Sequence, residues 1–163
     1  MTGLIYEHGS VTLYLVANEK GLCGVWHEQT KLRAGATFTR ELKEKTPATK
    51  ILKETKKQLD EYFAGQRQTF EIPLDMRGTD FQKKVWAELA KIPFGETLSY
   101  RDIAKKIKNE KAVRAVGTAN GRNPVSILVP CHRVIQANGT LGGYAGGLSL
   151  KEFLLDLEKT GRI

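Results

Sequence analysis

Residues 98–120 read LSYRDIAKKIKNEKAVRAVGTAN and contain two short helical patterns around a tight connection. The first pattern spans Leu98 to Ile107, the connection is Asn109 to Lys111, and the second pattern spans Ala112 to Asn120. Two short helices joined in this way are typical of a helix-turn-helix. The same outline also occurs in proteins that never contact DNA, so the pattern alone leaves both interpretations open.

The second helix of this pair is built almost entirely from small side chains. Ala, Gly and Thr dominate AVRAVGTAN, and Arg114 is its only long charged side chain. The backbone of such a helix can lie close to whatever it contacts. A single arginine is unusual on a helix face that only meets water, so Arg114 is a candidate functional residue.

The residues before position 78 predict a small unit of strands and one helix. Thr12–Ala17 and Gly21–Glu28 are short β-rich runs, and the turn residues between them predict a hairpin. Apolar residues at helical spacing predict a helix from Thr46 to Phe63. Thr69–Leu74 predicts a further strand, at a sheet edge because its proline lacks a backbone N–H.

From residue 78 onward the pattern is helical. Thr79 and Gln82 form a capping box at the head of one helix, and Ser149 and Glu152 form a second capping box near the end of the chain. The last helix ends before the final glycine, and its apolar stripe consists of leucines at helical spacing.

These patterns predict an α+β protein with two domains. Residues 1–77 form a small, mainly structural sheet-plus-helix domain, and residues 78–163 form a mostly helical domain that contains the helix-turn-helix. Charge is uneven between the parts: residues 1–79 hold 12 basic and 10 acidic side chains, and residues 80–163 hold 14 and 8. This excess suits a polyanion, although a basic surface that only contacts water has the same composition.

Cys23 and Cys131 are the two cysteines of the chain. They lack CxxC spacing, so they build neither a disulfide framework nor a four-cysteine zinc site. Cys23, His27 and His8 offer three metal ligands on paper, but this spacing in an apolar hairpin is weak evidence, and we expect no metal. Without a signal peptide or an apolar run of membrane-spanning length, we expect a cytoplasmic protein with reduced thiols.

Residues 127–135 read ILVPCHRVI and place a thiol, an imidazole and a guanidinium side by side. Ser126–Val129 predicts a short apolar strand, and Pro130 then suits the start of a helical turn. Cys131 would stand near the N-terminus of that turn, where partial positive charge and the neighbouring His132 favour a nucleophilic thiolate. The alternative is that this cysteine is a small core residue.

Four segments in the second half of the chain point to one family. They are PCHRV at 130–134, NPV at 123–125, RAVG at 114–117 and YAGG at 144–147. Together they resemble the O6-alkylguanine-DNA alkyltransferases, also called methylated-DNA-protein-cysteine methyltransferases. The resemblance runs from Phe81 to Glu158, about half of the chain, and the first half agrees only in its coarse pattern.

The resemblance implies DNA repair by a reaction that each molecule performs once and without a cofactor. Cys131 matches the cysteine that takes an alkyl group from O6 of guanine, and also from O4 of thymine, and keeps it. His132 and Glu158 match the histidine and acid that draw off the cysteine's proton through a water. Helical spacing alone places Glu158 at the edge of an apolar stripe, where an acid is typically solvated. Tyr100 matches the tyrosine that assists guanine as a leaving group.

The resemblance also assigns a base pocket. The backbone carbonyls of Cys131 and Val134 match acceptors for the exocyclic amine of guanine, and Tyr144 lines the pocket. Ala145 stands where some members have serine, and Ser126 stands where some have a second proline. The zinc ligands of some relatives have no full counterpart here.

The implied partner is double-stranded DNA, bound as a monomer through the minor groove with little sequence readout. Arg114 matches the arginine that enters the base stack after the damaged nucleotide is flipped out. Asn123 matches the asparagine that ties the recognition helix to the active-site turn, and Arg101 is placed near a phosphate. The small residues that suit a close approach to DNA are Ala112, Ala115, Gly117 and Ala119.

Two other functions compete with repair. A binding module that recognises the lesion without chemistry lacks the acceptor cysteine, so Cys131 argues against it. A turnover hydrolase built on Cys131, His132 and Glu158 would have no use for the helix-turn-helix. The number of product molecules formed per protein, which is zero, one or many, separates the three.

Overall fold

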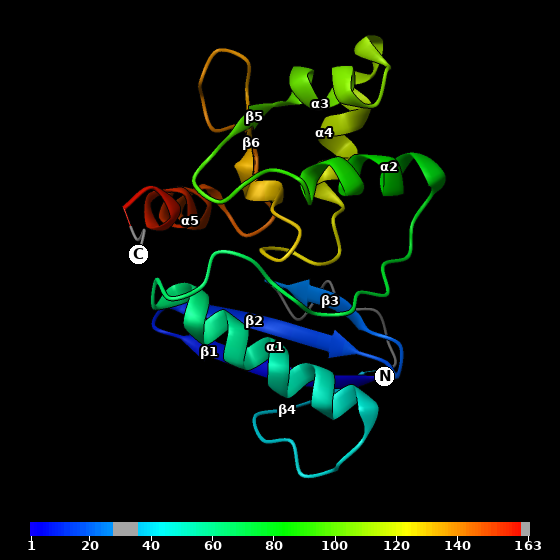
Figure 1. The fold of residues 1–163 in the computed structure, drawn as a ribbon, viewed down its shortest axis with the longest axis vertical. Helices are drawn as coiled ribbons and strands as arrows, with labels where there is room; N and C mark the ends of the chain where they lie inside the picture. The colour runs from blue at the N-terminus through cyan, green and yellow to red at the C-terminus, as the bar shows by residue number, and fades with distance from the viewer. Residues whose placement is uncertain (28–35, 161–163) are drawn as a thin grey trace. The chain divides into compact units, whose positions relative to one another are not determined.

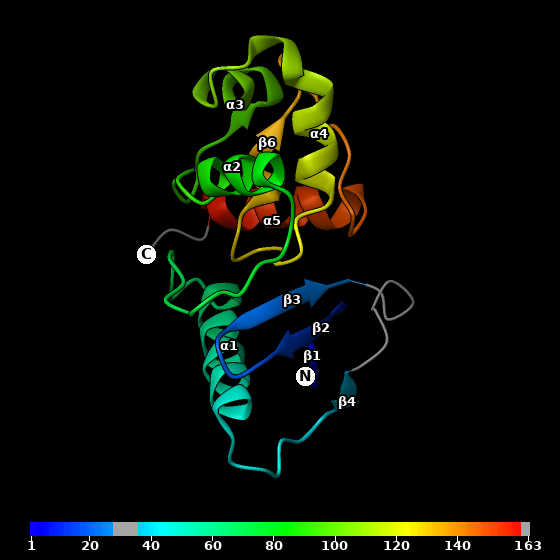
Figure 2. The ribbon, with the colours of Figure 1, turned by 90° about the vertical axis from the view of Figure 1, so that its right-hand side faces the viewer.

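The computed structural model describes residues 1–27 and 36–160, which form two compact units. Unit 1 is Met1–Arg77, and unit 2 begins at Gly78. Figures 1 and 2 show the elements of each unit from two directions. Within the described ranges no helix combines the length and the apolar character needed to cross a membrane.

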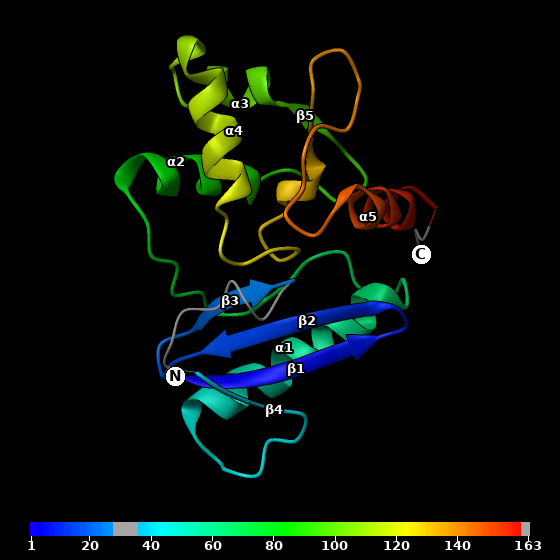
Figure 3. The ribbon, with the colours of Figure 1, turned by 180° about the vertical axis from the view of Figure 1, so that it is seen from behind.

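Unit 1 is a four-stranded sheet with one helix against it, and Figure 3 shows the sheet in front of that helix. The strands lie in the order β3-β2-β1-β4, with β4 parallel to β1 and the other pairs antiparallel. Their bounds are Thr2–His8 (β1), Val11–Ala17 (β2), Leu22–Trp26 (β3) and Thr37–Thr39 (β4). Alternate residues of β2, Leu13 and Leu15, are fully buried, as the period of two in a strand requires.

The helix of unit 1, α1 (Pro47–Phe63), confirms the predicted helix. Thr46 caps its N-terminus: the Thr46 hydroxyl accepts from the Thr49 N–H at 3.2 Å, and the Thr49 hydroxyl accepts from the Thr46 N–H at 2.8 Å. Leu52 and Leu59 are fully buried, so the apolar stripe of α1 forms the core of unit 1 together with β1 and β2.

The predicted hairpin between β2 and β3 is confirmed. The Asn18 N–H donates to the Gly21 carbonyl at 3.1 Å, and Asn18 Oδ1 accepts from the N–H groups of Lys20 and Gly21 at 2.8 and 3.0 Å. The sequence patterns missed β1 and β4, and the predicted end of the second run at Glu28 lies outside the described residues.

The predicted strand Thr69–Leu74 is wrong. Only Leu74 makes a bridge, an isolated one with Leu22. The backbone of Glu71 bonds instead to the side chain of Gln58, with N–H to Oε1 at 2.8 Å and Nε2 to carbonyl at 3.3 Å. The segment is therefore held by a buried glutamine of α1 rather than by a strand ladder.

Unit 2 is mostly helical and contains the predicted helix-turn-helix. Its elements are α2 (Asp80–Leu89), β5 (Leu98–Ser99), α3 (Tyr100–Lys106), η2 (Glu110–Ala112), α4 (Val113–Gly121), η3 (Cys131–Arg133), β6 (Val134–Ile135) and α5 (Leu148–Thr160). α3 and α4 are the helix pair, and the 3₁₀ helix η2 forms their connection. Trp86 of α2 donates its indole N–H to the Ala119 carbonyl at 2.8 Å, which ties α2 to α4.

Capping explains where the helices of unit 2 begin. Thr79 and Gln82 form the predicted box on α2, and Ser99 and Asp102 form another, which starts α3 at Tyr100. The predicted box at Ser149 is wrong, because α5 already begins at Leu148. Gly147, which has a φ of 93°, directly precedes α5. The chain therefore enters this helix through a turn whose backbone conformation favours glycine.

Candidate active site and DNA-binding surface

Cys131 follows a tight turn at residues 125–129, not the apolar strand that the sequence predicts. The Val129 N–H donates to the Val125 carbonyl at 3.0 Å, which closes the turn. Ile127 has a φ of 73°, a value that a β-branched residue rarely adopts. Asn123 fixes both ends: its Nδ2 donates to the Val129 carbonyl at 2.8 Å, and its Oδ1 accepts from the Val125 N–H at 3.0 Å.

The Cys131 side chain is 4% exposed. Burial raises the pKa of its thiol, and side-chain hydrogen bonds from Asn123 and Ser126 favour the thiolate without reversing that shift. At neutral pH the resting group is therefore the thiol. The short helical turn does not produce a standing thiolate, so a group that removes the proton during reaction is needed.

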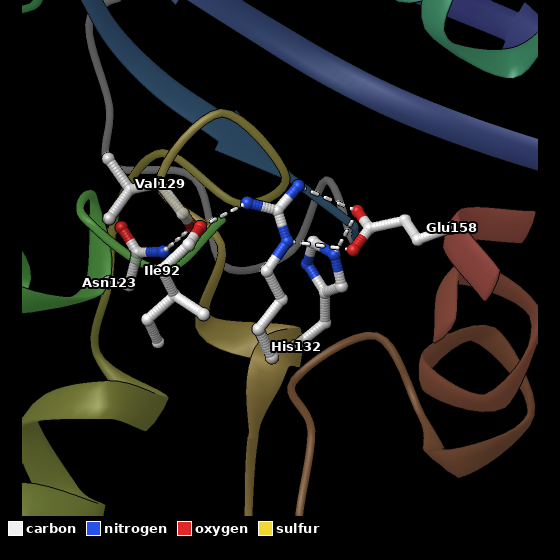
Figure 4. Close-up of polar contacts among 6 residues, drawn as sticks. Ile92, Asn123, Val129, His132 and Glu158 are labelled. Atoms are coloured by element: carbon white, nitrogen blue, oxygen red, sulfur yellow. Dashed lines mark hydrogen bonds and ion pairs between the residues drawn. The ribbon is translucent and has the colours of Figure 1, made fainter. Parts of the chain in front are cut away.

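His132, Arg133 and Glu158 form a buried cluster beside Cys131, shown in Figure 4. His132 Nε2 lies 2.7 Å from Glu158 Oε2. Arg133 donates to the same carboxylate twice, from Nε to Oε1 at 2.7 Å and from Nη2 to Oε2 at 2.9 Å. Its Nη1 donates to the Ile92 carbonyl at 2.6 Å. Glu158 is thus the common anchor of two consecutive residues of η3.

The charges of this cluster follow from its hydrogen bonds. Burial alone would raise the pKa of the Glu158 carboxyl, but the hydrogen bonds and charges of His132 and Arg133 outweigh it and lower that pKa to about 2. Burial lowers the pKa of His132, and the carboxylate opposes that shift without reversing it. At neutral pH Glu158 is therefore an anion and His132 is neutral.

A neutral His132 whose Nε2 faces a carboxylate carries its proton on Nε2. Its Nδ1 then has a free lone pair, and this buried atom makes no hydrogen bond to the described residues. Nδ1 is therefore the ring atom that is able to accept a proton. The cluster has the logic of a nucleophile, base and orienting acid.

Two tyrosines lie near the thiol. Burial raises the pKa of Tyr100, and a negative charge on Cys131 would raise it further; the same two causes act on Tyr144. A Cβ added at Gly142 would come within 3.0 Å of the Tyr100 hydroxyl, so the glycine-rich segment after β6 packs against this tyrosine. Both phenols therefore stay protonated near neutral pH, and a protonated phenol can donate a hydrogen bond.

The residues expected at DNA fall into two groups. Arg114, Ala115 and Arg101 are exposed, while Ala112 and Gly117 are half-buried. These residues belong to α3, η2 and α4. The exposed side chains among them are available to a partner.

Two of the residues expected at DNA are buried. Ala119 is 2% exposed and lies on the inner side of α4, where its carbonyl receives the Trp86 indole, so it is a packing residue. Asn123 is 5% exposed, and its amide forms hydrogen bonds within the turn before Cys131. It positions the active-site turn, and its contact with DNA stays a prediction.

Of the remaining pocket residues, Val134 is fully buried in β6, Tyr144 is half-buried and Ala145 is exposed. β6 pairs in parallel with β5, so Val134 lies opposite Leu98, directly before the cap of α3. The sheet of two short strands therefore brings the pocket backbone next to the helix that carries Tyr100.

Sequence reasoning missed Lys151, which is fully buried in α5. The buried residues of α5 are Lys151, Leu154 and Glu158, so two charged side chains share the inner face with one leucine. The sequence patterns placed leucines there instead. The available signal was the spacing of Lys151 and Glu158 on either side of Leu154, at three and four residues.

No metal site is found in residues 1–27 and 36–160, where no three metal-ligating side chains are grouped. Cys23 is half-buried, and its thiol contacts the Gly21 carbonyl at 3.6 Å. Burial raises the pKa of this thiol too. Unlike Cys131, it lies outside the His132 cluster.

Comparison with known proteins gives a consistent result along the chain. Residues 80–160 match the family model of the 6-O-methylguanine DNA methyltransferase DNA binding domain, and residues 12–76 match that of the 6-O-methylguanine DNA methyltransferase ribonuclease-like domain. The two matches meet close to the boundary between the units.

Similar proteins and structures agree. A methylated-DNA--protein-cysteine methyltransferase of Methanosarcina mazei is 59% identical over 109 residues, 67% of this chain and 69% of the relative. A constitutive one of Bacillus subtilis is 56% identical over 112 residues, 68% of each chain. The crystal structure of Mycobacterium tuberculosis OGT in complex with DNA matches with a TM-score of 0.88 and 40% identity over 99% of this chain and 95% of that one. The chain therefore belongs to the 6-O-methylguanine DNA methyltransferase family.

Proposed function

We propose that this chain repairs DNA by moving an alkyl group from O6 of guanine to Cys131, once per molecule. The observation that carries the proposal is a buried thiol next to His132, whose ring Glu158 holds at 2.7 Å. Family membership supports the same reaction, and the Methanosarcina mazei and Bacillus subtilis relatives share more than half of their aligned residues with this chain.

The residues supply each part of the transfer. The Cys131 proton leaves toward His132 Nδ1, and Sγ attacks the alkyl carbon. The bond from that carbon to O6 breaks, its electron pair goes to the guanine, and we assign the Tyr100 phenol to donate a hydrogen bond to the departing base. The guanine ends with one proton more, and the thiol with one fewer. Cys131 itself is the acceptor, so the reaction needs no cofactor. The thioether has no route back to a thiol, so each molecule reacts once.

The units would divide the work. Unit 2 holds both the acceptor and the exposed face of α3 and α4, which we assign to the minor groove of duplex DNA. Unit 1 is mainly structural in this proposal. A protein with a reduced acceptor thiol and a DNA substrate would work in the cytoplasm, at the nucleoid if the cell is prokaryotic.

The intact mass of the protein tests the function directly. After incubation with excess duplex DNA containing O6-methylguanine, we expect one added methyl group per chain, located on the peptide with Cys131. Unmodified protein with bound DNA would instead indicate a lesion-binding module. Many demethylated guanines per chain would indicate a turnover enzyme.

Arg114→Ala tests whether this exposed arginine fills the stack after the base leaves. We expect transfer from duplex DNA to slow by tenfold or more, since flipping a paired base costs a few kcal/mol, about 1.4 kcal/mol per factor of ten. Transfer from free O6-benzylguanine should be nearly unchanged, because no base must be extruded. Single-turnover rates at saturating substrate give both values.

Arg101→Ala is the matched control, since Arg101 is also exposed but lies on α3. A phosphate contact contributes to all DNA binding, so its loss should lower the salt slope by about one unit without a special penalty for paired DNA. If Arg114→Ala behaves like Arg101→Ala on paired and unpaired substrates, Arg114 is a phosphate contact and not a plug.

A further inference from the structure

Lys151 is a fully buried lysine that the proposed reaction does not use. Its ammonium donates to three backbone carbonyls: Val134 at 2.6 Å, Leu141 at 2.5 Å and Gly143 at 3.2 Å. An ammonium has three N–H donors and no acceptor, so these three bonds use its full capacity. None of its partners is a carboxylate.

The position of this lysine is costly. Burial lowers the pKa of Lys151, although the nearby Cys131 opposes the shift. Lys151 also lies in the first turn of α5, where the partial positive charge of the helix N-terminus disfavours a cation. A buried cation without a carboxylate, at the unfavourable end of a helix, calls for a role beyond packing.

The Leu141 and Gly143 carbonyls belong to the segment that packs against Tyr100. Leu141 and Gly143 flank Gly142, which has a φ of 71° and lies against the Tyr100 hydroxyl. Tyr144 follows directly. Gly139 and Gly147 also have positive φ values, so the segment from β6 to α5 has little conformational preference of its own. Lys151 joins this glycine-rich segment to the carbonyl of Val134.

That carbonyl has a second lone pair. A carbonyl oxygen accepts two hydrogen bonds, and Lys151 takes only one of the positions on Val134. We assign the remaining lone pair to the amine of the bound base. The direction of this lone pair depends on how Lys151 holds the Val134 carbonyl against the glycine-rich segment.

We propose that Lys151 is a positioning residue that aims the Val134 carbonyl at the exocyclic amine of guanine and thereby sets the preference of the pocket for a 2-aminopurine. This inference rests on the proposed function, because it assumes that an O6-alkylguanine occupies the pocket. The ammonium does not touch the substrate. It fixes the relation between the acceptor on β6 and the wall that carries Tyr144.

Two free bases that differ only in the amine provide the test: O6-benzylguanine and O6-benzylhypoxanthine, which lacks the 2-amino group. A buried hydrogen bond of this kind corresponds to about a tenfold difference in rate. We expect the wild-type protein to react at least about that much faster with the guanine derivative. In Lys151→Met, which keeps an unbranched side chain but removes the ammonium, the two rates should agree within about threefold because the acceptor is no longer aimed.

Lys159→Met is the matched control, since Lys159 is exposed near the end of the same helix, and it should keep the wild-type ratio. Lys151→Gln, which retains two donors, should give an intermediate ratio and serves if Lys151→Met fails to fold. Equal slowing of both substrates, with the ratio kept, would reduce Lys151 to a structural role and overturn the proposal. A wild-type protein that reacts with O6-benzylguanine and O6-benzylhypoxanthine at nearly equal rates would overturn the proposal as well. If the wild-type protein takes up no alkyl group from either base or from DNA, the proposed function itself fails.

Discussion

Replacing Cys131 by serine is expected to abolish alkyl uptake, with a loss of about a thousandfold or more, as when other enzymes lose their nucleophile. Sulfur is the better nucleophile, and the His132 cluster can remove a thiol proton far more readily than a hydroxyl proton. DNA affinity should change by less than about threefold, because phosphate contacts supply most of it and the buried thiol makes none. Mass spectrometry and a binding titration measure the two effects.

The control is the other cysteine. Cys23→Ala should keep the wild-type rate, because Cys23 belongs to unit 1 and the His132 cluster is built from residues of unit 2. Methyl uptake by Cys131→Ser, or a folded but inactive Cys23→Ala protein, would remove Cys131 from its role as acceptor.

Replacing Glu158 by glutamine should cost both stability and rate. Helical spacing alone suggests a solvated acid whose replacement leaves the fold stable, but Glu158 is 1% exposed and accepts two hydrogen bonds from Arg133 and one from His132. Removing one partner of a buried ion pair typically costs about 3–5 kcal/mol, since the guanidinium stays buried without its carboxylate. The imidazole also loses the group that sets its tautomer, so we expect transfer to slow by about a hundredfold or more.

The loss of folding stability in Glu158→Gln should depend on pH. The pKa of Glu158 is lowered from 4.5 to about 2 in the folded protein, so folding favours the ionised carboxyl. The stabilisation is fully present above about pH 5 and disappears as the pH falls toward 2, and its size is about 3 kcal/mol. Denaturant unfolding of both proteins should therefore show a large gap at pH 7 that narrows steadily below pH 4.

Glu152→Gln is the matched control, because Glu152 is an exposed acid on the same helix. It should change neither the rate nor the free energy of unfolding by more than about 0.5 kcal/mol, as is usual for surface substitutions. A gap between wild type and Glu158→Gln that stays constant from pH 7 to 3 would show that the carboxyl charge does not stabilise the fold.

Local chemistry made much of this fold predictable. Thr46 and Thr79 mark helix starts because their hydroxyls can satisfy free N–H groups at the helix end, and that signal lies within four residues. The helix pair and the hairpin at Asn18 are equally local. The motif around Cys131 pointed to the nucleophile and its base, although the roles of the individual side chains remain predictions.

The missed features depend on contacts between distant residues. Thr69–Leu74 has the composition of a strand, but Gln58 occupies its backbone groups. Ser126–Val129 also looks like a strand, and only the bonds from Asn123 hold it as a turn. Ala119 was expected to approach DNA, and the local pattern could not show its contact with Trp86 of α2, which lies 33 residues away in the sequence. Lys151 was overlooked because a lysine is ordinarily exposed.

One consequence of η3 concerns the spacing of its residues. A 3₁₀ helix has three residues per turn, so three successive side chains leave it in directions about 120° apart. Cys131, His132 and Arg133 therefore leave a single turn of backbone in three directions, and the side chains of His132 and Arg133 both reach Glu158. One residue inserted between any two of them would rotate the rest by a third of a turn and bring the wrong side chain to Glu158. The order Cys-His-Arg without gaps is thus a geometric requirement, and neither neighbour of His132 can move along the chain while Glu158 stays in place.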